Sequence, residues 1–390
     1  MKDRTRVIHP RDVPVPPDNR PLVAPIYQSV KFEIDRIDEA LRLFRGERPG
    51  FVYSRDSNPT NRQLELLLAD MQGREDCIVS ASGVAAVSTC LLAQCRAGDH
   101  VLCFVESYGP TRTLIRNLLG RYGVSHTMLS IEDDEGIERV LADRPTRLVV
   151  FESPTNPTTR IADIERITRA ARAAGALSVM DNTFAGLHNH GRYDVDLFVH
   201  SLTKYASGHG DVMGGAIIGS AALVKAMRPD AKTLGPVLDP HAAFLMLRGL
   251  KTYYLRYDAQ SAAAMRIATW LTEQPQVRSV RYPGLPSHPR HALAREQMKE
   301  FGTVVTFDLH GGLDEARVFT ESLALFSMTA SLGSVDSLVM PPQFMQPRDL
   351  TAEQRAICGV SESTVRLSIG AEDPDDLLED LDQALRQVPA

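Results

Sequence analysis

Residues 195–210 read VDLFVHSLTKYASGHG, and the rest of the chain is organised around this stretch. An apolar run ends at Val199, and Lys204 follows among hydroxyl-bearing and small residues. The pattern predicts a strand that delivers a lysine into a crowded pocket, where burial lowers the pKa of the amine and allows it to form an imine. A lysine after a strand is more often exposed, so this motif alone leaves both interpretations open.

Apolar strands and amphipathic helices alternate around this stretch. Strands are predicted at 100–105, 124–129, 147–152, 176–180, 196–200 and 215–219, and helices at 64–71, 83–95, 111–122, 134–143 and 163–174. Strands joined by helical crossovers predict an α/β fold, with a mostly parallel central sheet and helices on both faces. Sites in such sheets lie at the carboxyl ends of the strands. The polar residues at those ends are Glu152, Asn156, Asp181, Ser201, Thr203 and Lys204.

The two flanking regions read differently. Residues 1–60 predict an irregular N-terminal arm with one short helix at about 37–45. Its early part is rich in proline, which fixes φ and removes a backbone hydrogen-bond donor. The prolines are Pro10, Pro14, Pro16, Pro17, Pro21 and Pro25. An arm with little to bury suggests packing on another subunit, and the alternative is a loose tail.

We expect a main domain over 61–250 and a smaller α+β C-terminal domain over 251–390. A long helical stretch at 240–274 is predicted to link them. The C-terminal domain is predicted to contain strands at 304–309 and 364–370 and helices at 316–323 and 373–386.

Composition limits the functional class. The chain has 390 residues, 43% of them hydrophobic, and a formal net charge of -6, which gives no electrostatic case for nucleic-acid binding. No apolar run is long enough to span a bilayer, and the N-terminus lacks a secretory pattern. The cysteines are odd in number and form no CxxC pair, so we expect free thiols in the cytoplasm and no metal site. They are Cys77, Cys90, Cys95, Cys103 and Cys358.

An imine-forming lysine could work with an aromatic aldehyde cofactor that carries a phosphate. The small-residue turn before the helix at 83–95 would present unpaired first-turn amides to an anion. The alternative is an ordinary Ser82 N-cap on a core helix. The candidates for a phosphate site are Gly83, Val84, Ser201 and Thr203.

Three further side chains suit the same chemistry. Asp181 could keep a pyridine nitrogen protonated, Tyr108 could stack on the ring, and Arg366 offers a bidentate fork for a substrate carboxylate. Each has an ordinary alternative: a turn or cap residue for Asp181, a core or interface residue for Tyr108, and a salt-bridge partner for Arg366. The ordered set favours the functional interpretation.

In this order the motifs resemble the Cys/Met-metabolism group of pyridoxal-phosphate (PLP) enzymes of fold type I. That group includes cystathionine γ-synthase, cystathionine β- and γ-lyases, methionine γ-lyase and homoserine-ester sulfhydrylases. The resemblance covers nearly the whole chain and rests on residues 53–60 (YSR…NPT), 82–83 (SG), 108–109 (YG), 152–157 (ESPTNP), 181–184 (DNTF), 201–205 (SLTKY), 331–333 (SLG) and 365–370 (VRLSIG).

The resemblance implies a role for each matching residue. Lys204 would hold PLP as an imine and then move protons, Asp181 would pair with the pyridinium, and Tyr108 would stack on the ring and help in proton transfer. Tyr53 and Arg55 would reach the phosphate of a neighbouring subunit, which implies an obligate homodimer, usually doubled to a tetramer. The phosphate would be held by Gly83, Val84, Ser201 and Thr203. Asn156 would contact the ring oxygen or the substrate carboxylate, and Arg366 would bind the carboxylate, with Ser331 nearby.

Three departures from the relatives bear on the substrate. Pro110 stands where methionine γ-lyases favour Cys, which argues against that activity, Asp336 stands where many members carry Glu, and residues 341–347 lack a His-Pro…Met-Thr-His pattern. Val84 replaces a common Met, but the ligand there is a backbone amide, so this change is expected to preserve function.

We therefore expect a carbon–sulfur lyase that eliminates from cystathionine or a related sulfur amino acid to give a 2-oxo acid, ammonia and a thiol. The alternative within the group is γ-replacement, by a cystathionine γ-synthase or an O-acylhomoserine sulfhydrylase. An aminotransferase on the same fold and a non-catalytic scaffold are the alternatives outside it.

Overall fold

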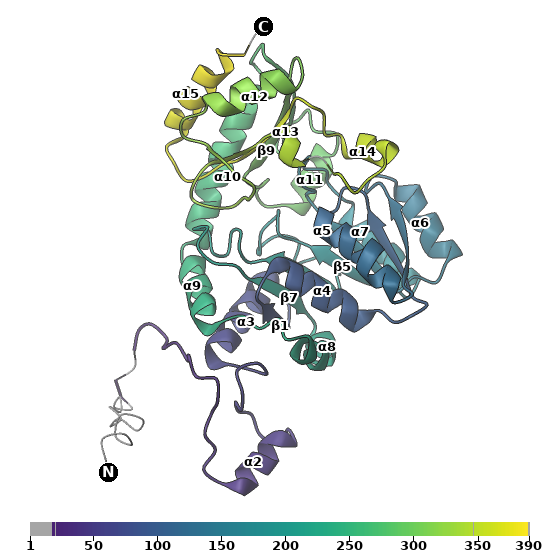
Figure 1. Ribbon diagram of the computed structural model, residues 1–390, viewed down its shortest axis with the longest axis vertical. Helices are drawn as coiled ribbons and strands as arrows, with labels where there is room; N and C mark the ends of the chain where they lie inside the picture. The colour runs from purple at the N-terminus through teal and green to yellow at the C-terminus, as the bar shows by residue number, and fades with distance from the viewer. Residues whose placement is uncertain (1–17, 20, 346, 389–390) are drawn as a thin grey trace.

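The computed structural model describes residues 18–19, 21–345 and 347–388 (Figure 1). Four of the prolines predicted to stiffen the arm, Pro10, Pro14, Pro16 and Pro17, lie outside the described residues. The described chain builds two sheets, one of seven strands and one of five. The two sheets differ in strand direction, and the loops at the carboxyl end of the first sheet meet the second sheet and its loops at the candidate site.

The seven-stranded sheet has the order β1-β7-β6-β5-β4-β2-β3, and β7 is antiparallel to both its neighbours while the remaining pairs are parallel. This confirms the mostly parallel sheet predicted from the alternating pattern. Its strands are β1 (Asp76–Ser80), β2 (His100–Phe104), β3 (Ser125–Leu129), β4 (Leu148–Glu152), β5 (Leu177–Asp181), β6 (Leu197–Ser201) and β7 (Gly215–Gly219).

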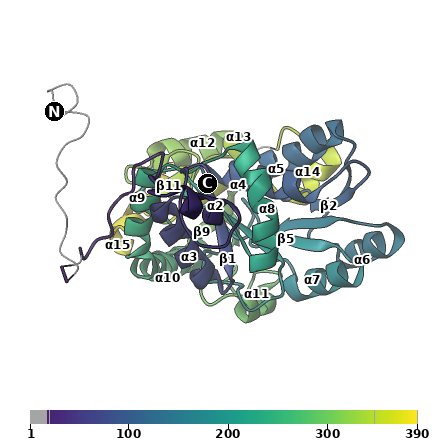
Figure 2. The ribbon, with the colours of Figure 1, turned by 90° about the horizontal axis from the view of Figure 1, so that it is seen from below.

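Helices cover both faces of this sheet, so its strands are apolar on both sides. Within β2, Leu102 packs into one core and Cys103 into the other, as the two-residue period of a strand requires. One core is shared with α4 (Gly83–Gln94), η1 (Leu114–Leu119) and α8 (Ala221–Leu234). The other is shared with α3 (Pro59–Gln72), α6 (Asp134–Asp143), α7 (Ile164–Ala173) and α9 (Pro240–Leu250); Figure 2 shows α6 and α7 together beside β5.

Two predicted helices are wrong in detail. The stretch 240–274 is not one helix, because α9 ends at Leu250 and α10 (Tyr253–Leu271) begins after a break. At the break Arg256 Nη2 donates to the Gly249 carbonyl at 2.9 Å and to the Tyr205 carbonyl at 3.0 Å, so the chain turns around the loop that carries Lys204. The predicted helix 111–122 is a short α5 (Gly109–Thr113) followed by the π-helical η1.

The five-stranded sheet has the order β10-β11-β12-β9-β8 and is antiparallel except for the β10–β11 pair. Its strands are β8 (Val277–Arg281), β9 (Val304–Leu309), β10 (Ser327–Met328), β11 (Leu338–Met340) and β12 (Thr364–Ser368). One face packs against α10, α12 (Leu313–Ser322) and α15 (Pro374–Leu385) in a separate core. The strands β9 and β12 confirm the sequence pattern, whereas β8, α8, α11 (His291–Gln297) and α14 (Ala352–Cys358) were not predicted.

The chain passes from one sheet to the other through α10 (Figure 1). The domain boundaries at residues 60 and 250 stay predictions. No helix in the described part of the chain is long and apolar enough to cross a membrane.

The described part of the arm stands away from both sheets (Figure 1). Its helix α2 (Ile37–Phe44) lies within one residue of the predicted 37–45 and buries none of its residues. Large apolar side chains are exposed along the arm, with Leu22 100%, Ile37 81% and Phe44 71% exposed. Such a segment gains nothing from burial in the single chain.

Candidate active site

Lys204 lies in the turn that follows β6, at the carboxyl end of the parallel sheet. Its Nζ donates to Ser331 Oγ at 2.8 Å, and burial, with Arg366 as a second cause, lowers the pKa of the amine to about 8. The turn depends on Gly208, which has a φ of +69° and where a Cβ would lie 1.9 Å from the Arg256 guanidinium. The lysine is therefore the partly buried amine that the sequence pattern allows, and the solvent-exposed alternative is wrong.

The small-residue turn before α4 meets the end of β6. Ser82 caps the helix through a hydrogen bond from Ala85 N–H at 3.1 Å, so the ordinary N-cap interpretation is also correct. A Cβ added to Gly83 would lie 2.7 Å from Ser201 Cβ, which shows how closely the two backbones approach. The hydroxyl of Thr203 accepts from Gly214 N–H at 3.2 Å. First-turn amides beside two hydroxyls form a cradle that suits a phosphate.

Asp181 and Glu152 are partners in neighbouring strands. Burial raises the pKa of both, and in Glu152, with Asp181 as a second cause, it raises the pKa to about 8. Their donors are backbone N–H groups: Thr183 donates to Asp181 at 3.0 Å, and Tyr108 and Asn156 donate to Glu152 at 3.2 and 3.0 Å. Two desolvated carboxyls held this way favour a cationic ligand such as a protonated pyridine. Glu152 was predicted only as a polar strand end, although it opens the ESPTNP motif.

Arg366 lies on β12 of the five-stranded sheet and is 3% exposed. Its Nη1 donates to Asn156 Oδ1 at 2.9 Å and its Nη2 donates to the Ser331 carbonyl, while its Nε has no partner among the described residues. Burial lowers the pKa of Arg366 to about 10. A buried guanidinium that faces neutral acceptors and keeps a free donor fits a carboxylate ligand.

Tyr108 precedes α5 and is 43% exposed. Its backbone N–H donates to Glu152 at 3.2 Å, and burial, followed by the charges of Asp181 and Glu152, raises the pKa of its phenol. Tyr53 and Arg55 lie apart from this group, on the exposed base of the arm, where the Arg55 guanidinium carbon is 5.0 Å from the centre of the Tyr53 ring. Within the described chain these two side chains contact each other, and their role at the phosphate site of a neighbouring subunit stays a prediction.

The residues present fit PLP. The site contains an amine with a lowered pKa at Lys204, a glycine-bounded cradle at Gly83 and Ser201, and a buried carboxyl at Asp181. Val84 is 43% exposed beside the cradle. The structure therefore brings together ten of the twelve predicted site residues, from both sheets, and leaves Tyr53 and Arg55 outside.

Comparison with known proteins agrees with this geometry. The family described as Cys/Met metabolism PLP-dependent enzyme matches residues 4–386. An L-methionine gamma-lyase of Pseudomonas putida is 42% identical over 369 residues, which cover 94% of this chain and 92% of that one.

Two solved structures show the same fold. A cystathionine gamma synthase of Xanthomonas oryzae has a TM-score of 0.88 at 35% identity, over 94% of this chain and 93% of that one. A Campylobacter jejuni protein designated O-acetylhomoserine (thiol)-lyase has a TM-score of 0.89 at 32% identity, over 94% and 96%, and was solved with N'-pyridoxyl-lysine-5'-monophosphate. These similarities confirm the fold type I architecture. The chain belongs to the Cys/Met-metabolism family of PLP-dependent enzymes.

Proposed function

We propose that this enzyme is a carbon–sulfur lyase that eliminates from cystathionine or a related sulfur amino acid. The observation that carries the proposal is the position of Ser331. Its hydroxyl accepts from Lys204 Nζ at 2.8 Å, and its carbonyl accepts from the Arg366 guanidinium. One residue thus joins the amine that moves protons to the guanidinium that would hold an α-carboxylate. This arrangement suits a substrate whose Cα lies between the two groups.

The cofactor would be held by residues from three strand ends. Gly83, Val84, Ser201 and Thr203 would surround its phosphate, Asp181 would face its ring nitrogen, and Tyr108 would cover the ring. When bound, PLP supplies an aldehyde that condenses with amines and a ring that stabilises negative charge at Cα. Asp181 favours the protonated ring because its carboxylate would otherwise remain buried without a cation.

The protein groups divide the remaining work. Arg366 and Asn156 hold the substrate carboxylate and fix the orientation of Cα. Lys204 accepts the Cα proton, and its lowered pKa makes the neutral amine available near pH 8. Elimination of a β-thiolate then needs no further proton from the substrate carbon chain, whereas loss of a γ-substituent requires Lys204 to move a second proton from Cβ.

Elimination and γ-replacement differ in the fate of the substrate after the leaving group departs. The 42% identity to a methionine γ-lyase favours elimination, while Pro110 stands where those lyases favour Cys. The similarity to a cystathionine γ-synthase supports γ-replacement as the alternative.

Product identification tests the proposal. The holoenzyme is incubated separately with cystathionine, cysteine, methionine and acylhomoserines, with and without added thiol. A lyase releases a 2-oxo acid and ammonia from a sulfur amino acid without any thiol. If an acylhomoserine is turned over only when a thiol is added, and no sulfur amino acid yields a 2-oxo acid, the protein is a γ-replacement enzyme and the lyase proposal is wrong.

We also propose that the enzyme is a cytoplasmic homodimer, doubled to a tetramer, in which Tyr53 and Arg55 reach the phosphate site of the neighbouring subunit. The exposed apolar side chains of the arm support this assembly, and the buried free thiols of all five cysteines suit a reducing compartment. Mixing an Arg55→Ala variant with a Lys204→Ala variant tests whether Arg55 of one subunit contributes to the site of its neighbour. Recovery of activity on mixing supports a shared site, and no recovery from a mixed dimer contradicts it.

A further inference from the structure

One face of the five-stranded sheet is polar and meets the loop that carries Asn156. Cross-strand partners place their side chains on the same face, and in β8, β9 and β12 these partners form two rows. The first row is Arg281, Thr306 and Arg366, and the second is Ser279, Asp308 and Thr364. Val305 and Phe307, on the opposite face of β9, belong to the apolar core of that sheet. The polar face therefore places Thr306 directly beside Arg366.

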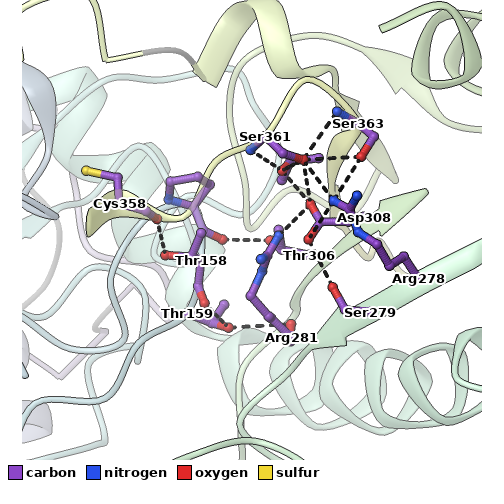
Figure 3. A network of polar contacts seen from close by, with 12 residues as sticks. Thr158, Thr159, Arg278, Ser279, Arg281, Thr306, Asp308, Cys358, Ser361 and Ser363 are labelled. Carbon is purple, nitrogen blue, oxygen red and sulfur yellow. Dashed lines mark hydrogen bonds and ion pairs between the residues drawn. The ribbon is translucent and has the colours of Figure 1, made fainter. Parts of the chain in front are cut away.

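Thr306 makes one contact that crosses between the two sheets. Its hydroxyl donates to the carbonyl of Pro157 at 2.6 Å, and the Thr306 side chain is fully buried (Figure 3). Proline has no N–H, so this carbonyl is its only polar backbone group. Pro157 is half-buried and the Thr306 hydroxyl is fully buried, so the loss of this hydrogen bond would leave the carbonyl without its donor and weaken one of the contacts that hold the loop.

Asn156 is the residue immediately before Pro157, and it is held on both sides. Its backbone N–H donates to Glu152 at 3.0 Å, while Thr306 holds the carbonyl that follows it. Its side-chain Oδ1 accepts from Arg366 Nη1 at 2.9 Å. Thr306 and Arg366 are thus neighbours in the sheet and also meet through Asn156.

The strand that carries Thr306 is anchored by its second polar row (Figure 3). Asp308 accepts from Ser279 Oγ at 2.9 Å, from Arg281 Nη2 at 2.9 Å and from Thr364 Oγ1 at 2.5 Å. Burial alone would raise the pKa of Asp308, but the Arg281 charge and these donors hold it below its ordinary value. The carboxylate therefore ties three strands together and gives Thr306 a rigid base.

We propose that Thr306 is a positioning residue for the substrate carboxylate. Its hydroxyl holds the Pro157 carbonyl so that Asn156 keeps the Arg366 fork in one orientation. This inference rests on the proposed function, in which Arg366 binds the α-carboxylate. Thr306 does not touch the substrate or the reacting atoms, and acts only through Asn156.

The test compares two ligands that differ by the carboxylate. The PLP-loaded enzyme is titrated with glycine and with methylamine, and binding is followed by the cofactor absorbance. Thr306→Val keeps the shape of the side chain and removes the hydroxyl. We expect Thr306→Val to raise the dissociation constant of glycine about fivefold to tenfold, because one oriented hydrogen bond is lost. The dissociation constant of methylamine should change by less than about twofold.

Two variants serve as controls. Thr306→Ser keeps the hydroxyl and is expected to restore the ratio of the two dissociation constants. Thr320→Val removes another buried hydroxyl, which donates to the Ala316 carbonyl at 2.7 Å within α12, far from Asn156 in the sequence. It is expected to lower stability and to leave the ratio unchanged. The absorbance spectrum before titration reports that PLP is bound in each variant.

The outcomes separate this inference from the proposed function. If Arg366→Lys changes the ratio and Thr306→Val does not, Thr306 is only structural and the inference is wrong. If Thr306→Val weakens both ligands equally, the inference is wrong as well. If Arg366→Lys leaves the ratio unchanged, the carboxylate assignment of the proposed function fails, and the inference fails with it.

Discussion

The two sheets carry their functional residues in different places. In the seven-stranded sheet, Asp181, Ser201 and Lys204 stand at or beyond strand ends, whereas Arg366 and Thr306 stand in the middle of strands in the five-stranded sheet. The first sheet is covered by helices on both faces, so the middles of its strands are mostly apolar and its polar site residues lie at the strand ends. The second has one face on an apolar core, and its other face carries two polar rows.

This difference has a chemical consequence. Strand ends are followed by loops with free backbone N–H groups, which suit a phosphate and a flexible, proton-moving amine. The middle of a strand is the most rigid place for a side chain, which suits a guanidinium that must keep one orientation. The cofactor half of the site thus lies on strand ends and the carboxylate half on a strand face.

The largest expected effect is at a strand end. Lys204→Ala removes the amine that moves protons, and we expect kcat to fall by roughly 10³-fold or more. Steady-state kinetics of 2-oxo acid release measure it. The exposed Lys225→Ala on α8 is the matched control and should keep full activity. Activity within tenfold of the parent enzyme would show that another group moves the proton.

The strand-face position comes next. Arg366→Lys keeps the charge but loses the bidentate fork, and we expect kcat/KM to fall by about 10²-fold, mainly through KM. Arg278→Lys, on β8 of the same sheet and 46% exposed, is the control and should stay within about twofold. A larger effect at Arg278 than at Arg366 would contradict the assignment of the carboxylate site.

The pKa of the amine predicts how the cofactor-free enzyme reacts with an aldehyde. Because burial lowers the pKa of Lys204 from 10.5 to about 8, the neutral amine becomes abundant as the pH rises through about 8. Labelling of Lys204 by pyridoxal, trapped by borohydride, should increase about tenfold per pH unit below that value and then level off. Mass spectrometry of the labelled peptide measures it. A rise that continues to pH 10 would show an ordinary lysine.

A smaller effect is expected at the phosphate cradle. In Gly83→Ala the new Cβ would lie 2.7 Å from Ser201 Cβ, so the loop or the serine must shift. We expect PLP to bind about tenfold more weakly, as measured by fluorescence titration of the cofactor-free protein. Gly120→Ala is the control, since its Cβ would meet nothing within 4 Å. Equal PLP affinities in the two variants would show that the Gly83 cradle does not bind the phosphate.

The smallest effect concerns the anchor of the polar face. We expect Asp308→Asn to lower the free energy of unfolding by about 2 kcal/mol at pH 7. The folded-state pKa of Asp308 is depressed, so its stabilisation is present above the ordinary value of 3.8 and is lost as the pH falls through the folded-state pKa. The difference from the parent protein in urea unfolding should therefore narrow below about pH 3.8. Asp314→Asn, at an exposed pair with Arg317, should change little.

Sequence patterns predicted the strand-end half of the site better than the strand-face half. Lys204, Asp181 and Gly83 each follow an apolar run that periodicity reveals. Arg366 was predicted from its motif, but nothing in the sequence indicated its hydrogen bond to Asn156, 210 residues away. Thr306 was missed as a site residue because its contact with Pro157 joins the two halves of the fold. Glu152 was missed because its pairing with Asp181 depends on the order of the strands in the first sheet. The break in the predicted helix at 240–274 was missed because the hydrogen bond from Arg256 to the Tyr205 carbonyl beside it joins residues far apart in the sequence.

By itself, the sequence determined the alternation of strands and helices, the lysine at a strand end and the family. These are local properties, because side-chain period, turn residues and short motifs act over a few neighbouring positions. Only the tertiary structure decided that Ser331 joins Lys204 to Arg366 and that Thr306 holds the loop of Asn156. The contacts of Ser331 with Lys204 and of Thr306 with Pro157 join residues more than 100 positions apart, and the contact of Arg366 with Ser331 joins a strand to a loop 35 positions away. Their geometry therefore follows from the tertiary packing.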